Sequence, residues 1–192
     1  MTRGPWVISK ASRPFGRDAQ MHDSSFGWRF INPKLDALYG TDGMGTTAEN
    51  LVDLHGISRE DQDRFAAWSQ EKATLAQQQG HFAEEIGSVR IPRRKQDDLI
   101  FDADEFIKPK STQDILAKLR PAFRKEGGTV TAGNSSGLND GACALLMANQ
   151  EGMKQHGWTP LAQIVSSAVV GVEPRIMGIG PVEASKQALS KA

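Results

Sequence analysis

The sequence predicts an α/β fold, because signals for capped helices and for short β-branched strands alternate along the chain. The clearest helix signal is the run 59–79, in which apolar residues recur at helical spacing. Ser58 and Asp61 form a capping box before this run, and Gly80 closes it. The clearest strand signal is the valine-rich run 161–172, whose composition is typical of a buried strand.

The N-terminal part of the chain carries weaker signals. Residues 1–43 are rich in proline, glycine and aromatic residues, and we expect them to be irregular and to be functional or docked on other structure. A helix is predicted to begin near Met44, where Thr46 and Glu49 fit a second capping box. Gly56 is a suitable stop for that helix.

The remaining elements follow the long helix in a regular order. We predict a hairpin, a short helix, a strand, a helix, the valine-rich strand and a last helix. The hairpin should pair 86–91 with 99–101, and the short helix should be capped by Ser111 and Asp114 and end before Pro121. The strand is expected at 128–133 and the next helix at about 139–156. The last helix should begin at Pro181.

Composition excludes several classes of protein. Lys+Arg and Asp+Glu balance at 23 each, so no strong field favours nucleic acid or an anionic membrane as a partner. Cys143 is the single cysteine, which excludes a disulfide framework and an all-cysteine metal site. The N-terminus lacks the apolar stretch of a secretory signal, and no apolar run is long enough to span a bilayer. We therefore expect a soluble, cytoplasmic protein.

Two residue types that often carry chemistry offer little here. Cys143 lies on the apolar side of the predicted helix 139–156, so we expect it to be buried and structural. The four histidines show no metal-binding spacing, and we expect no metal site. The segment GIGPVEA at 178–184 lacks the GxGxxG spacing of a dinucleotide-binding loop.

Three long segments together resemble the thiolase family. They are MGTTAENLVDLHGISREDQDRFAAWSQEKA at 44–73, GTVTAGNSSGLNDGACALL at 128–146 and GVEPRIMGIGPVEASKQAL at 171–189. Their order and spacing match the family, and the resemblance covers essentially the whole chain. The segment GWRFINPKLDALYGTDGM at 27–44 is most similar to the degradative branch that cleaves 3-oxoadipyl-CoA.

The resemblance implies an acyltransferase that cleaves a 3-oxoacyl-CoA with CoA to acetyl-CoA and a shortened acyl-CoA. Coenzyme A would then be a substrate, no separate cofactor is expected, and a homo-oligomer is expected because thiolases are dimers or tetramers. The full family fold is a five-layer αβαβα sandwich, of which this chain would hold part. Residues 1–125 match the loop domain that covers CoA, 126–157 the end of the N-terminal core half, and 158–192 the start of the C-terminal core half.

The family's reacting residues have no counterpart in the sequence. Thiolases use a nucleophilic cysteine early in the chain and a histidine and second cysteine near its end, and Cys143 matches none of these. Thiolysis needs a thiolate to take the acyl group and a base to activate it. We therefore assign no catalytic residue and expect the chain alone to be inactive. A non-catalytic CoA-binding module and a truncated, inactive product remain the alternatives.

The resemblance also implies a CoA site. Ser136 would hydrogen-bond the pantetheine arm, and the small residue Ala132 would lie beside that arm. Three apolar side chains would line the channel of the arm, namely Met44, Phe123 and Met177. Lys108 would supply a cation near the nucleotide end.

The residues themselves leave plainer interpretations open. The segment GNSSGLNDG at 133–141 can be an ordinary strand-to-helix turn with Asn139 or Asp140 as the N-cap. The three apolar side chains can belong to the core. The basic cluster in the predicted hairpin, from Arg90 to Lys95, can be a solvated turn.

Overall fold

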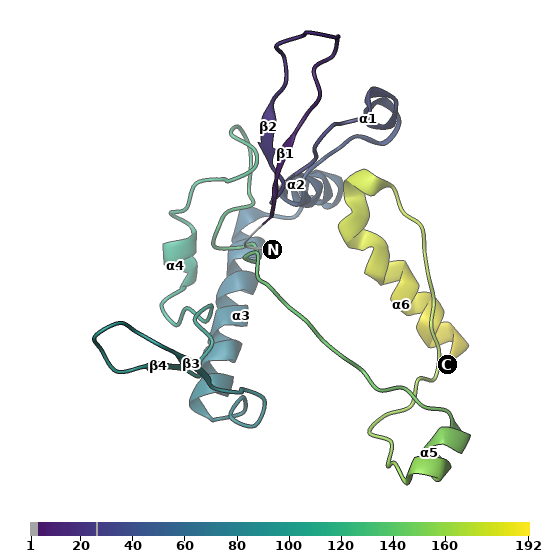
Figure 1. Ribbon diagram of the computed structural model, residues 1–192. Helices are drawn as coiled ribbons and strands as arrows, with labels where there is room; N and C mark the ends of the chain where they lie inside the picture. The colour runs from purple at the N-terminus through teal and green to yellow at the C-terminus, as the bar shows by residue number, and fades with distance from the viewer. Residues whose placement is uncertain (1–3, 26) are drawn as a thin grey trace. The chain divides into compact units, whose positions relative to one another are not determined.

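The computed structural model describes residues 4–25 and 27–192 and contains both helices and strands (Figure 1). The chain divides into two compact units. The central unit is Val52–Ser136, and the discontinuous unit consists of the chain up to Leu51 together with Gly137–Ala192. Each unit is described by itself.

The central unit is built on the long helix α3, Arg59–Gln78, which confirms the helix predicted at 59–79. Its N-cap is Ser58, whose hydroxyl oxygen accepts a hydrogen bond from the Asp61 amide at 3.0 Å. The short helix α4, Gln113–Leu116, packs against α3. Its N-cap is Thr112 and not the predicted Ser111, because Thr112 has the extended backbone of a cap and its hydroxyl accepts from the amide of Ile115.

A two-stranded antiparallel hairpin completes the regular elements of the central unit. Strand β3, Val89–Ile91, pairs with β4, Leu99–Phe101, with Arg90 opposite Ile100. The predicted hairpin is thus confirmed, although β3 begins later than expected. In the turn, Arg93 Nε donates to the carbonyl of Asp97 at 2.9 Å, so this cation is engaged within its own hairpin.

The core of the central unit lies where α4 and residues 129–131 meet α3. Leu116 and Val130 are buried apolar residues, and Thr131 is fully buried. The strand predicted at 128–133 is wrong: the structure has a single antiparallel bridge, between Pro121 and Thr131. Proline has no N–H to donate, so the ladder does not extend through this neighbour.

The discontinuous unit begins with structure that the sequence analysis did not expect. Strands β1, Trp6–Ile8, and β2, Met21–Asp23, pair antiparallel, and helix α1, Pro33–Tyr39, follows. Asn32 caps α1 by accepting a hydrogen bond from the amide of Lys34 at 2.9 Å, and Pro33 fits the first helical turn. The prediction that 1–43 is irregular is therefore wrong for the described part. Residues 1–3 and 26 lie outside the described residues.

Helix α2, Met44–His55, confirms the helix predicted for this segment. The predicted capping box is wrong, because Thr46 and Glu49 both lie inside the helix. The boundary between the two units falls within α2. The C-terminal part of the discontinuous unit holds α5, Gln150–His156, the 3-10 helix η1, Pro174–Ile179, and α6, Gly180–Lys191. Helix α6 begins one residue before Pro181, in agreement with the predicted start of the last helix.

The helix predicted at 139–156 is present only as α5, and its first part, 139–149, is irregular. Leu145 and Leu146 are 86% and 78% exposed. A helix in a protein gains most of its stability from packing an apolar face against other structure, and the described chain offers no such packing to these two side chains. Cys143 lies in the same segment and is exposed, so the expectation of a buried structural cysteine is wrong.

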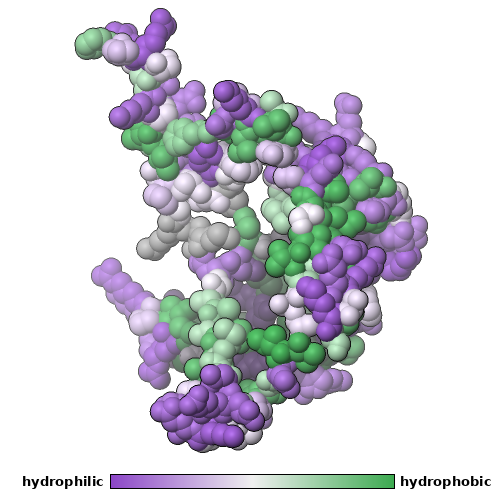
Figure 2. Space-filling model, turned by 90° about the vertical axis from the view of Figure 1, so that its right-hand side faces the viewer, coloured by the Kyte–Doolittle hydropathy of each residue, from purple (hydrophilic) through white to green (hydrophobic). Residues whose placement is uncertain are grey.

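The strand predicted at 161–172 is also absent from the described chain. A strand needs a neighbour for its backbone N–H and C=O groups, and no described residues form a ladder with this segment. The segment instead hydrogen-bonds to α6, since Ser166 Oγ donates to the Ala188 carbonyl at 2.6 Å and Lys191 Nζ donates to the Ser167 carbonyl at 3.2 Å. Figure 2 shows hydrophobic residues at several places on one face of the surface. Val169, in this segment, is 94% exposed.

None of the described helices is both long enough and apolar enough to cross a lipid bilayer.

Candidate functional site

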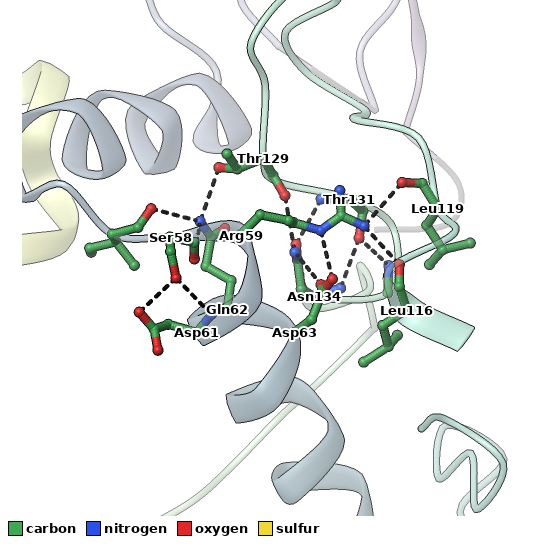
Figure 3. A network of polar contacts seen from close by, with 12 residues as sticks. Ser58, Arg59, Asp61, Gln62, Asp63, Leu116, Leu119, Thr129, Thr131 and Asn134 are labelled. Atoms are coloured by element: carbon green, nitrogen blue, oxygen red, sulfur yellow. Dashed lines mark hydrogen bonds and ion pairs between the residues drawn. The ribbon is translucent and has the colours of Figure 1, made fainter. Parts of the chain in front are cut away.

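An ion pair on α3, between a half-buried arginine and a buried aspartate, lies at the centre of a polar network in the central unit (Figure 3). Asp63 is 1% exposed, and its Oδ2 accepts from Arg59 Nε at 2.7 Å, one helical turn away. Arg59 also donates through Nη2 to the carbonyls of Leu116 at 2.7 Å and Leu119 at 3.0 Å. The remaining oxygen of Asp63, Oδ1, accepts from Asn134 Nδ2 at 2.9 Å. This cluster therefore joins α3 to the end of α4 and to the turn that contains Asn134.

The turn 128–136 is further held by hydrogen bonds of its own. Asn134 Oδ1 accepts from the amide of Thr131 at 2.7 Å, and Asn134 Nδ2 donates to the carbonyl of Thr129 at 3.1 Å as well as to Asp63. Thr131 Oγ1 accepts from the amides of Gly133 at 3.1 Å and Asn134 at 3.2 Å. Satisfied buried networks of this kind favour one backbone conformation.

Close packing adds to this constraint at Gly133. A Cβ atom added there would lie 2.4 Å from Leu119 Cδ1 and 2.5 Å from Leu116 Cδ2, closer than such atoms approach. The backbone of the turn thus packs directly on the leucines at the end of α4. Glycine is the residue that permits such an approach.

Three of the predicted CoA-site residues lie on or beside this turn. Ala132 and Ser136 belong to the turn itself, and both are exposed. Phe123, 49% exposed, lies in the neighbouring segment, where the amide of Ala122 donates to the carbonyl of Val130 at 2.9 Å. The structure therefore brings Phe123, Ala132 and Ser136 to adjacent segments of one unit.

Lys108 lies apart from that group, in a loop that is fixed further along α3. Its backbone amide donates to Gln70 Oε1 at 2.7 Å, and its Nζ donates to the carbonyl of Glu105 at 2.7 Å. Gln70 follows Asp63 by about two helical turns, roughly 10 Å along the axis. Lys108 is exposed, so its ammonium remains accessible to a phosphate.

The discontinuous unit contains the two predicted methionines. Met44 is the first residue of α2 and is 71% exposed, and Met177 lies in η1 and is 44% exposed. The first turns of α2 contact η1, because Asn50 Nδ2 donates to the carbonyl of Arg175 at 2.9 Å. Met44 and Met177 therefore lie on contacting segments, and neither is a core residue. The assembly of one CoA site from residues of both units stays a prediction.

A hollow of about 870 Å³ lies on another face of α3, and none of the predicted CoA-site residues lines it. Its walls include Phe65 and Trp68, whose rings meet edge to face with centroids 6.1 Å apart, and the loop residues Pro109 and Thr112. Lys72 Nζ lies 3.5 Å from the centre of the Trp68 ring, a cation–π contact.

No group of three or more His, Cys, Asp and Glu side chains in the described chain is placed to hold a metal ion. Asp61 is held at the start of α3 by the Ser58 hydroxyl and, secondarily, by the charge of Arg64, and both lower the pKa of its carboxyl group below the ordinary value. This is a helix-capping arrangement.

The sequence analysis missed the residues that fix the turn, namely Arg59, Asp63 and Asn134. One signal was present: Arg59 and Asp63 are four residues apart in a capped helix, the spacing of an intrahelical ion pair. No local signal points from Asp63 to Asn134, because 71 residues separate them.

Comparison with known proteins identifies the family. The family model described as "Thiolase, N-terminal domain" matches residues 6–151. The Acinetobacter baylyi protein named beta-ketoadipyl-CoA thiolase is 48% identical over 192 residues, which are 100% of this chain and 48% of that protein. The Chromobacterium violaceum protein named acetyl-CoA acetyltransferase is 51% identical over 180 residues, covering 93% of this chain and 46% of that protein.

The fold comparison agrees. The crystal structure of human mitochondrial 3-ketoacyl-CoA thiolase matches with a TM-score of 0.79 and 37% identity, covering 98% of this chain and 46% of that one. The chain therefore belongs to the thiolase family and has a partial α/β thiolase fold. It spans about half the length of the curated relatives that it matches.

Proposed function

We propose that this chain is the CoA-binding part of a thiolase-type acyltransferase that cleaves a 3-oxoacyl-CoA with CoA to acetyl-CoA and a shortened acyl-CoA. The observation that carries this proposal is the 48% identity, over the whole chain, to a protein named beta-ketoadipyl-CoA thiolase. The same match supports 3-oxoadipyl-CoA, or a similar dicarboxylic acyl-CoA, as the substrate.

In the proposed site, the Ser136 hydroxyl hydrogen-bonds an amide of the pantetheine arm, and the small side chain of Ala132 leaves room for the arm beside it. Met44, Phe123 and Met177 supply apolar walls, and Lys108 interacts with a phosphate of the nucleotide. Coenzyme A acts as a substrate, with no separate cofactor. The exposure of all six side chains supports this assignment, because none is committed to the core.

The reaction itself needs groups beyond these six. In thiolysis a thiolate sulfur bonds to C3 of the substrate, the C2–C3 bond breaks, and C2 takes a proton to give acetyl-CoA. The thiol of a second CoA then takes the acyl group from the enzyme sulfur, and a base accepts the thiol proton. Cys143 is the single cysteine of the sequence, it is exposed, and no described residue hydrogen-bonds to it. We therefore propose that the 192-residue chain alone does not perform this reaction.

A second candidate function is acetyl transfer between CoA thioesters with a shorter acyl chain. The 51% identity to a protein named acetyl-CoA acetyltransferase favours it. Both candidates use the same proposed CoA site and differ in the acyl group. A cytoplasmic location and self-association into a homo-oligomer complete the proposal.

A chimera tests the proposed function directly. In this chimera, the present 192 residues replace the matching stretch of the Acinetobacter baylyi protein. We expect the chimera to consume 3-oxoadipyl-CoA in a CoA-dependent way, followed by the loss of the enolate absorbance, and to act more slowly on acetoacetyl-CoA. The isolated chain should show no turnover. The opposite substrate preference would favour acetyl transfer, and turnover by the isolated chain that Cys143→Ala abolishes would make Cys143 a nucleophile.

Two substitutions in the chimera test the site. Ser136→Ala removes one neutral hydrogen bond and should weaken CoA binding by about 1 kcal/mol in a calorimetric titration. Ala132→Phe fills the space of the pantetheine arm and should weaken binding more, because the ligand is sterically excluded. If neither variant alters the CoA affinity, the site assignment is wrong even though the family assignment stands.

A further inference from the structure

Asn134 uses both ends of its side-chain amide to hold the turn on α3. Its Oδ1 accepts from the Thr131 amide at 2.7 Å, and its Nδ2 donates to Asp63 Oδ1 at 2.9 Å and to the Thr129 carbonyl at 3.1 Å. These bonds reach the backbone on both sides of Val130 as well as a side chain on the long helix. Only a side-chain amide presents an acceptor and two donors in this arrangement.

Asp63 is the fixed end of this connection. It projects from α3, is 1% exposed, and is oriented by Arg59, whose Nε donates to its other oxygen at 2.7 Å. Arg59 is in turn fixed by the carbonyls of Leu116 and Leu119. A carboxylate with so little exposure is not placed to contact a ligand, and its direct connection to the turn is the hydrogen bond from Asn134.

Asn134 lies midway between the two residues of the turn that the proposed function assigns to the pantetheine arm, Ala132 and Ser136. Both of those residues are exposed, while Thr131, the residue before Ala132, is fully buried. Exposed groups on a short turn keep a defined position only when contacts on the buried side of the turn fix their backbone. The bonds of Asn134 are placed to do this.

We propose that Asn134 and Asp63 are positioning residues for the CoA site, which hold the backbone of Ala132 and Ser136 at the place where the pantetheine arm binds. This inference rests on the proposed function. Asn134 and Asp63 would then affect the KM for CoA without contacting CoA themselves.

The test uses Asn134→Ala in the active chimera, with CoA as the varied substrate. Removing the amide frees Ala132 and Ser136 to move, and the weakened contacts with the pantetheine arm should raise the KM for CoA about tenfold, which corresponds to about 1.4 kcal/mol. Because the reacting groups lie elsewhere, kcat should change by less than about twofold. A residue that only stabilises the fold would give the reverse pattern: less active protein, a lower apparent kcat and an unchanged KM.

Ser58→Ala is the matched control. It removes the N-cap of the same helix, and the Ser58 hydroxyl bonds to Asp61 and not to the turn. We expect it to lower the melting temperature of the chimera by an amount similar to Asn134→Ala while leaving the KM for CoA unchanged.

Exchanging the side chains of Asn134 and Asp63 distinguishes the loss of their hydrogen bond from a general loss of stability. Asn134→Asp alone sets a second carboxylate against Asp63 and removes the donor to Thr129, so its KM for CoA should exceed that of Asn134→Ala. Adding Asp63→Asn restores a donor between the two positions and should recover part of the loss. An unsubstituted chimera that neither binds CoA nor turns over contradicts the proposed function. An active chimera whose KM for CoA is unaffected by Asn134→Ala, or one with no recovery in the exchanged pair, overturns the positioning role alone.

Discussion

Residues 128–136 and residues 137–149 follow each other in the chain, and neither forms a helix or a paired strand beyond one bridge, yet they differ sharply in burial. In the first segment Val130 and Thr131 are buried, and the Asn134 side chain bonds to Asp63 on a distant helix. In the second, every residue is exposed, including Leu145 at 86%. Irregular backbone can thus be as firmly held as a helix when side chains satisfy it, and an apolar sequence does not by itself make a segment part of a core.

The largest difference between the two segments should come from truncating a leucine. Leu116 is 2% exposed and packs under the 128–136 turn, so Leu116→Ala should lower the free energy of unfolding by about 3 kcal/mol through the cavity it leaves. Leu145→Ala should change it by less than about 0.5 kcal/mol, because that side chain is already in solvent. Urea denaturation followed by circular dichroism measures both. Equal effects would mean that 137–149 contributes to a core after all.

Adding one methyl group should change the free energy of unfolding more in 128–136 than in 137–149, but the difference should be smaller than for the leucine variants. A Cβ at Gly128 would lie 2.3 Å from the backbone carbonyl oxygen of Arg124, which cannot move without shifting the chain, so Gly128→Ala should cost about 2 kcal/mol of stability. At Gly141 a Cβ meets nothing within 4 Å, and Gly141→Ala should be neutral to within about 0.5 kcal/mol. The same denaturation experiment applies, and a neutral Gly128→Ala would show that this turn adapts readily.

Loss of a helix cap should have a smaller effect again. Ser58→Ala removes the cap of α3, which carries Arg59 and Asp63, and should cost about 1 kcal/mol of global stability. Asn149 caps the short helix α5 by accepting from the amide of Gly152 at 2.8 Å. Asn149→Ala should reduce the helical circular dichroism signal slightly without moving the urea midpoint. A shifted midpoint for Asn149→Ala would tie α5 to the cooperative core.

The smallest expected effect concerns pH. The Ser58 hydroxyl and then the charge of Arg64 lower the pKa of the Asp61 carboxyl group in the folded chain. A lowered pKa contributes stability at pH values above the unfolded pKa of about 4, and this contribution is lost as the pH falls through the folded value. Stability measured from about pH 5 to pH 2 should therefore fall less steeply in Asp61→Asn than in the unsubstituted chain. Identical slopes would mean that the Asp61 carboxylate does not contribute to the pH dependence of stability.

Elements with local signals could be predicted from the sequence. Helices α2 and α3 and the β3–β4 hairpin were expected at nearly their observed positions, because caps, helical spacing and turn residues lie within each segment. Helix α1 carried an equally local signal in Asn32 and Pro33, but the surrounding prolines and glycines concealed it. Strands β1 and β2 have three residues each, as β3 and β4 do, but residues 9–20 separate them, a longer connection than residues 92–98 in the predicted hairpin, so no short turn indicates that they pair.

Elements that depend on distant partners could not be predicted. The apolar runs at 139–149 and 161–172 satisfy the composition of a helix and a strand, but the described chain provides neither a packing face nor a neighbouring strand for them. The candidate site shows the same limit. Family resemblance pointed to Ser136 and Ala132, whereas the partner that fixes their turn, Asp63, is on a helix far away in sequence. Single-sequence patterns do not encode such a pair.

The contact between Lys72 and Trp68 has a spectroscopic consequence. Of the four tryptophans in the chain, Trp68 is the only one between Val52 and Ser136, and the others, Trp6, Trp28 and Trp158, belong to the discontinuous unit. An ammonium group 3.5 Å from an indole ring perturbs the excited state of the ring, and this perturbation ends when the helix unwinds. With the other three tryptophans replaced by phenylalanine, the emission of Trp68 would report the opening of the central unit alone, on the same helix that presents Asp63 to the 128–136 turn.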